Sequence, residues 1–96
     1  MDARIIWDLE DDADGNVQHL REHDVTIEEA EEVLLNPESS RAVSRTSGLP
    51  TAFGWTSTGR HLAVVYEIVD ADPLALRPVT AYDVPPPGPK KKRRRK

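Results

Sequence analysis

The side chains best suited to proton transfer near neutral pH are three histidines, His19, His23 and His61. His19 and His23 are four residues apart, so a helix would place them on one face. His23 falls at the end of that predicted helix, where the helix dipole favours its charged form. We therefore treat His23 as a candidate general acid or base, or as a phosphate contact, and His19 as a surface residue. An alternative is that His23 only caps the helix by hydrogen-bonding a free carbonyl.

These residue types would serve metal-independent cleavage of RNA, a reaction that a family resemblance over roughly residues 4–84 implies. It needs a base for the ribose 2′-hydroxyl, an acid for the leaving oxygen and cations on the phosphate. The predicted catalytic residues are His23, Tyr82, Arg45 and Arg60. The predicted substrate-binding residues are Arg41, Trp55, His61 and Arg77. Trp55 would stack on a base, although a tryptophan in so small a chain also suits core packing.

A metal site is the other chemistry that two histidines four residues apart allow. A third ligand would have to come from His61 or from an acid such as Glu22. Structural zinc sites usually recruit cysteine, and this chain has none, which also removes disulfides and thiolate nucleophiles. We therefore predict no metal and no cofactor.

The charge of the chain divides into two parts of opposite sign. Residues 1–89 hold six cationic side chains against all 17 acidic ones, a net charge of −11. Such a body repels a phosphate backbone. A basic tail follows it, and this tail would bind RNA or DNA, act as a localisation signal or serve as a counter-ion for the body. The tail consists of Lys90, Lys91, Lys92, Arg93, Arg94, Arg95 and Lys96.

The length of 96 residues predicts one domain, over residues 1–84. The first residues show no basic region followed by an apolar run, so we expect no signal peptide. No apolar stretch approaches the roughly 20 residues that cross a bilayer. We expect a cytoplasmic protein without membrane contact, and self-association stays open.

Two helices are predicted in the first half, after a strand at Arg4–Trp7. The first helix covers about residues 14–23. The second begins at Thr26, whose spacing to Glu29 is that of a capping box, and ends before Asn36–Pro37. Its apolar face comprises Ile27, Ala30, Val33 and Leu34. Its glutamates form either a solvated face or a docking surface for a basic partner.

Strands are predicted in the second half, at Ser40–Ser44, Thr51–Thr56, His61–Val69 and Leu76–Val84. Pro78 inside the last of them indicates an edge strand or a bulge. The predicted fold is α+β, with an N-terminal strand and two helices on one side of a sheet of three or four antiparallel strands. Residues 85–96, first proline-rich and then basic, are predicted to be extended and flexible.

Several of these residues lie in a familiar order: Trp7-Asp8, Asn16, His23, Thr26 and Asn36-Pro37, followed by the two closing strands. The order resembles that of BrnT-type toxins of bacterial type II toxin–antitoxin systems over roughly residues 4–84. The resemblance implies a fold like that of RelE-type ribonucleases, cytoplasmic residence and a ribbon-helix-helix antitoxin as partner.

The chain departs from the family pattern at its cations. Glu22 stands where the family has a lysine, Leu49-Pro50 and Tyr82 stand where it has arginines, and the tail replaces its C-terminal helix. Two hypotheses follow. The first is a BrnT-like toxin subunit that cleaves RNA without a metal. The second is a catalytically inactive module of the same fold that binds a protein or nucleic-acid partner.

Overall fold

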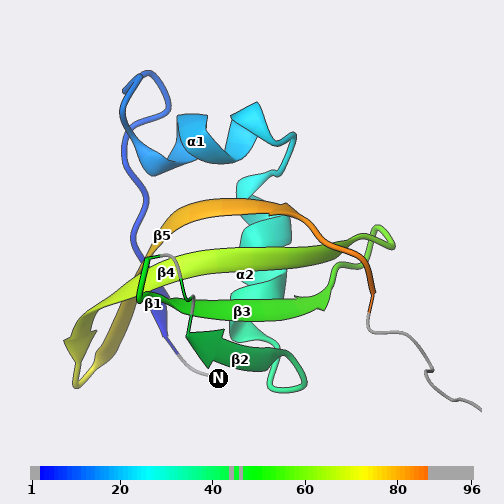
Figure 1. Ribbon diagram of the computed structural model, residues 1–96. Coiled ribbons are helices and arrows are strands. Elements are labelled where there is room, and N and C mark those ends of the chain that lie inside the picture. The colour runs from blue at the N-terminus through cyan, green and yellow to red at the C-terminus, as the bar shows by residue number, and fades with distance from the viewer. Residues whose placement is uncertain (1–2, 44, 46, 87–96) are drawn as a thin grey trace, which may run out of the picture.

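A computed structural model describes residues 3–43, 45 and 47–86 as two helices packed on a five-stranded mixed sheet (Figure 1). The order of strands across the sheet is β1-β5-β4-β3-β2. The basic tail, predicted to be flexible, lies outside the described residues. The elements are β1 (Arg4–Ile5), α1 (Asn16–Glu22), α2 (Ile27–Leu35), β2 (Ser40–Val43), β3 (Pro50–Trp55), β4 (His61–Ala71) and β5 (Leu74–Asp83).

The sheet differs from the predicted one by its fifth strand. Strands β2 to β5 are antiparallel neighbours, whereas β1 pairs parallel with β5, Arg4 opposite Ala75. β1 is shorter than the predicted strand, although Ile6 N–H beyond it still donates to Leu76 O at 2.8 Å. β5 is therefore an inner strand. Pro78 lies within it beside a register shift, so of the two predicted alternatives the bulge is correct.

Asn16 fixes the entry of the chain into α1. Its side chain is 1% exposed, and its Nδ2 donates to Ile6 O at 3.0 Å and to Pro78 O at 2.9 Å. Asp8 N–H donates to Asn16 Oδ1, and Asn16 N–H donates to Asp8 Oδ2, both at 2.9 Å. Asn16 thus joins the end of β1, the start of α1 and the middle of β5. α1 begins at this residue and ends at Glu22, so it is shorter than the predicted helix over about residues 14–23.

The start and end of α2 agree with the prediction. Glu29 N–H donates to Thr26 Oγ1 and Thr26 N–H donates to Glu29 Oε1, each at 3.1 Å, which completes the capping box. The helix ends at Leu35, with Asn36 as its C-cap before the proline. Its apolar side faces the sheet, where Val33 and Leu34 are 0% exposed.

Both helices contribute to a single buried cluster with one face of the sheet. Leu20 of α1 and Leu34 of α2 pack there with Leu62, Val64 and Tyr66 of β4. The predicted alternation of β4 holds over these three residues. It fails at Ile68, which is 56% exposed, because the β4–β5 hairpin extends beyond α2 (Figure 1).

The opposite face of the sheet carries aromatic side chains, and we call it the open face. Trp55 of β3 pairs with His61 of β4. Ala63 of β4 lies between its two partners, Phe53 of β3 and Tyr82 of β5. Trp55 is 52% exposed and Tyr82 is 37% exposed. The interpretation of Trp55 as a core residue is therefore wrong. Neither α1 nor α2 is long and apolar enough to cross a membrane.

Candidate functional site

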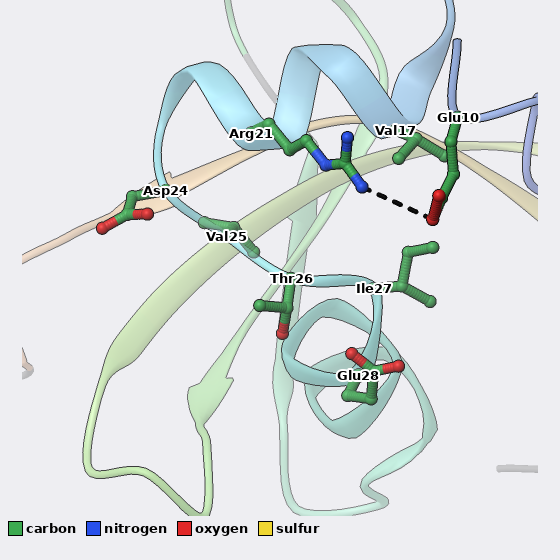
Figure 2. A pocket seen from close by; sticks show the side chains of 8 residues that line it. All are labelled: Glu10, Val17, Arg21, Asp24, Val25, Thr26, Ile27 and Glu28. Carbon is green, nitrogen blue, oxygen red and sulfur yellow. Dashed lines mark ion pairs between the residues drawn. The ribbon is translucent and has the colours of Figure 1, made fainter.

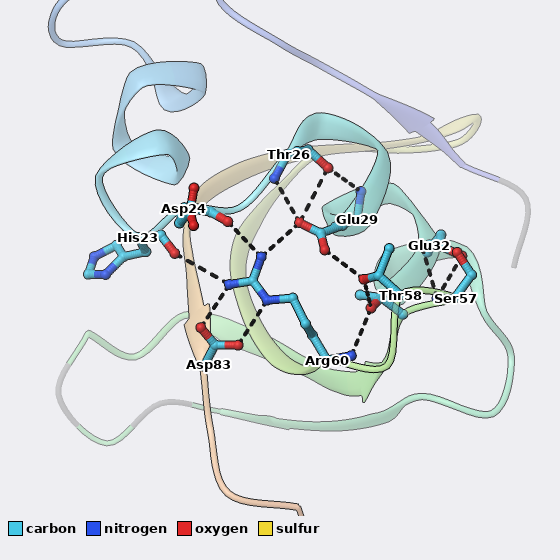
Figure 3. A network of polar contacts seen from close by, with 10 residues as sticks. His23, Asp24, Thr26, Glu29, Glu32, Ser57, Thr58, Arg60 and Asp83 are labelled. Atoms are coloured by element: carbon cyan, nitrogen blue, oxygen red, sulfur yellow. Dashed lines mark hydrogen bonds and ion pairs between the residues drawn. The ribbon is translucent and has the colours of Figure 1, made fainter.

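Arg60, predicted to hold a phosphate, is bound by the protein itself (Figure 3). Its Nε and Nη2 donate to the two carboxylate oxygens of Asp83 at 3.0 and 2.7 Å. Its Nη1 donates to Glu29 Oε1 at 2.9 Å and to Asp24 O at 2.6 Å, and its Nη2 also reaches His23 O at 3.5 Å. Every N–H of the guanidinium therefore has a protein acceptor. We call Arg60, Glu29 and Asp83 the Arg60 clasp.

Glu29 is the buried acid of the clasp, at 7% exposure. Its Oε2 accepts a hydrogen bond of 2.8 Å from Thr58 Oγ1, in addition to the capping bond from Thr26 N–H. Burial raises the pKa of Glu29, but these hydrogen bonds and the charge of Arg60 outweigh it, so the pKa lies below its ordinary value. The hydrogen bond from Arg60 likewise lowers the pKa of Asp83. Both acids are held in their charged forms.

His23 lies at the C-terminus of α1 with its ring directed away from the guanidinium of Arg60 (Figure 3). Only its backbone oxygen faces that group. The ring makes no hydrogen bond within the described part of the chain, and the helix end is capped by the backbone N–H of His23, which donates to Leu20 O at 3.0 Å. The ring contact of His23 is Tyr82, with centroids 6.1 Å apart and planes tilted by 58°. The structure thus brings together the rings of His23 and Tyr82, whereas Arg60 reaches only the backbone oxygen of His23 and Arg45 lies in the connection after β2.

The other predicted arginines serve different parts of the fold. Arg77 pairs with Asp8 at 2.6 Å and with Glu67 at 3.4 Å. Arg41 donates to Leu34 O at 2.6 Å and lies 5.7 Å from the centre of the Tyr66 ring, on the helix side of the sheet. Arg45 is exposed in the connection after β2. Arg77 lies in the middle of β5 and Arg41 on the edge strand β2, whereas the ring of His23 contacts Tyr82 near the end of β5.

His61 and Trp55, both predicted to bind substrate, are partners across β3 and β4. Their ring centroids are 4.9 Å apart with planes tilted by 51°. They line a cavity of about 340 Å³ at the end of the sheet, together with Phe53 and the residues between α2 and β2. The rings of His61, Trp55 and Tyr82 therefore lie on the open face, which offers stacking surfaces.

A second cavity, of about 500 Å³, lies between the two helices and was not anticipated from the sequence (Figure 2). We call it the helix groove. Its apolar floor is formed by Val17 and Val25, each 2% exposed, and by Ile27. Its polar rim consists of Glu10, Arg21, Asp24, Thr26 and Glu28.

The rim of the helix groove has an excess of carboxylates. Glu10 and Arg21 form an ion pair of 3.4 Å whose side chains are 67% and 54% exposed, so the pair is weak. Within the described residues, Asp24 and Glu28 form no ion pair, and their side chains are exposed. The groove therefore suits a ligand that is both cationic and aliphatic.

The helix groove could not be predicted from the sequence because its walls come from three separate segments of the chain. Its shape depends on the reversal between α1 and α2, where Asp24 has a φ of 61°. An aspartate tolerates this left-handed conformation better than most residues, which is the one local signal of the reversal. No spacing rule connects Glu10 with Asp24 or Glu28.

No group of three or more histidine, aspartate or glutamate side chains in residues 3–43, 45 and 47–86 is arranged to hold a metal ion. Comparison with protein-family models, with curated proteins and with solved structures finds no match to this chain. The resemblance to BrnT-type toxins therefore stays a prediction.

Proposed function

We propose that this domain is a catalytically inactive BrnT-like module that binds a basic protein partner. The observation that carries the proposal is the helix groove, where Asp24 and Glu28 face solvent beside an apolar floor. The Arg60 clasp adds to it, since the arginine that a phosphate would need is saturated by Glu29 and Asp83.

The charge of the body supports the same proposal. A net charge of −11 over residues 1–89 attracts a basic partner and speeds its association. The partner implied by the resemblance is a ribbon-helix-helix antitoxin. Such a protein binds DNA and therefore carries basic side chains, which the acidic rim of the groove would attract. In this proposal the antitoxin would place lysine or arginine side chains on the rim.

Titration with a purified ribbon-helix-helix protein, taken from a reading frame next to the gene for this chain, tests the proposal. We expect measurable affinity by calorimetry that falls as salt rises. Asp24→Asn with Glu28→Gln should weaken the Kd at least tenfold. Glu38→Gln with Asp72→Asn is the matched control, because it removes the same charge from exposed positions outside the groove and should change the Kd less than twofold. An equal Kd for both double variants would refute the proposed surface.

A second candidate function is the metal-independent endoribonuclease. It is favoured by the contact between His23 and Tyr82, two groups able to transfer protons, and by the exposed ring of Trp55, which suits base stacking. Induction of the wild-type chain in bacteria separates the two functions. An enzyme should arrest growth, and His23→Ala with Tyr82→Phe should relieve the arrest. A binding module should leave growth unchanged in both cases.

A further inference from the structure

We propose that the basic tail of this chain, Lys90–Lys96, binds the helix groove of the same molecule and competes there with the basic partner. The self-binding stands independently, whereas the competition rests on the proposed function.

The proposal starts from the place where the chain leaves the sheet. β5 ends at Asp83, which the Arg60 clasp holds at 2.7 Å. The same guanidinium binds the backbone oxygen of Asp24, a residue of the groove rim, at 2.6 Å. The exit of the chain is therefore one side chain away from the groove.

The length of the connection suffices for the tail to reach the groove. Val84 N–H still donates to His61 O at 3.0 Å, which fixes the direction in which the chain leaves the sheet. The residues from Val84 to Lys90 can span about 20 Å when extended. An intramolecular segment on so short a connection has an effective concentration in the millimolar range. Even weak contacts would then keep the groove occupied.

The chemistry of the tail complements that of the groove. Lysine and arginine cover apolar surface with their aliphatic stems while their charged ends stay in water. The stems would lie on Val17, Val25 and Ile27, and the charged ends would reach Asp24 and Glu28 on the rim. Binding of the tail to the groove would also reduce two electrostatic repulsions, one among the seven cations of the tail and one within the body of charge −11.

The first experiment compares amide NMR spectra of the full chain with those of a variant of equal length whose residues 90–96 are all glutamine. We expect differences concentrated at Val17, Asp24, Val25 and Ile27. Addition of a synthetic Lys-Lys-Lys-Arg-Arg-Arg-Lys peptide to the glutamine variant should move these amides towards their positions in the wild-type chain. Superimposable spectra, or shifts confined to the open face, would overturn the self-binding.

The second experiment separates the groove from general attraction to an acidic body. In the glutamine variant, Asp24→Asn with Glu28→Gln should weaken peptide binding at least fivefold. Glu38→Gln with Asp72→Asn should change it less than twofold, because both positions lie outside the groove. Equal weakening by both pairs would refute a specific groove site.

The third experiment tests the competition alone. Replacement of the tail by glutamine should strengthen binding of the ribbon-helix-helix protein about fivefold, because the partner no longer has to displace the tail. If NMR shows the tail in the groove but the partner binds both chains equally, the competition is refuted while the self-binding stands. If the partner binds neither chain, the proposed function fails and the NMR result is unaffected.

Discussion

The Arg60 clasp and the helix groove are neighbouring acidic regions that differ in the pairing of their carboxylates. In the clasp, Glu29 and Asp83 are neutralised by a guanidinium that has no donor left over. In the groove, Asp24 and Glu28 face solvent without an ion pair from the described residues. Asp24 belongs to both regions, because its backbone oxygen accepts a hydrogen bond from Arg60 and the residue also lines the groove. The paired charges of the clasp hold α1, α2 and β5 together, whereas the exposed charges of the groove are those that the proposed basic partner would bind.

The largest effect is expected from Arg60→Ala. This change leaves Glu29 buried without its counter-ion and frees the ends of α1, α2 and β5 from one another. We expect a loss of about 3–4 kcal/mol in the free energy of unfolding, measured by urea denaturation. Arg21→Ala, which breaks an exposed pair at the groove, should cost less than about 0.5 kcal/mol. Similar losses in the two variants would remove the distinction between clasp and groove.

The second-largest loss in the free energy of unfolding is expected from Asn16→Ala. It leaves Ile6 O and Pro78 O without their donor inside the protein, so the expected loss is about 2–3 kcal/mol. Gln18→Ala is a suitable comparison, since its amide donates to Glu10 O at the surface and should contribute under about 0.5 kcal/mol. A small effect of Asn16→Ala would show that the clasp alone fixes the first helix.

Glu29→Gln isolates the charge of the clasp, because glutamine still forms a capping box with Thr26. The folded pKa of Glu29 lies below its ordinary 4.5, so its contribution is present above that pH and is lost as pH falls through the lowered pKa. At pH 7 the variant should be about 1–2 kcal/mol less stable than the wild type. The two unfolding curves should converge in acid. Curves that stay parallel down to pH 3 would contradict the assigned role of the carboxylate.

The smallest effect on stability is expected in the groove itself. Asp24→Asn with Glu28→Gln removes two like charges that form no ion pair with the described residues, and asparagine tolerates the φ of 61° at position 24. The free energy of unfolding should change by less than about 0.5 kcal/mol. A loss of several kcal/mol would mean that these acids hold the fold, as those of the clasp do.

The sequence was sufficient where the interactions are local. The capping box of α2 joins residues three apart and predicts the start of the helix. The apolar spacing predicts the burial of Ala30, Val33 and Leu34, whereas Glu29, expected on the polar side, is buried. The alternation of apolar residues in β4 is also local, and it predicts that Leu62, Val64 and Tyr66 all face the helices. The end of α2 before Pro37 follows from the restriction that proline imposes on its neighbour.

The candidate site could not be predicted in the same way, because its residues meet only through the tertiary structure. His23 and Tyr82 were both expected at the site, and their rings do lie together. The role of Arg60 depends on Asp24, Glu29 and Asp83, none of which is its neighbour in the chain. An arginine that holds a phosphate and one that holds two carboxylates have the same appearance in a sequence. The helix groove has no sequence pattern at all.

The parallel pairing of β1 with β5 has a consequence for the timing of folding. Arg4 and Ile5 leave the ribosome long before their partners Ala75 and Leu76 are made. During synthesis the start of the chain must wait without its ladder, while the hairpins between β2 and β4 can already form from neighbouring residues. Closure of the domain is therefore a late event in biosynthesis, and a nascent chain stalled before β5 would expose an incomplete core to proteases and chaperones.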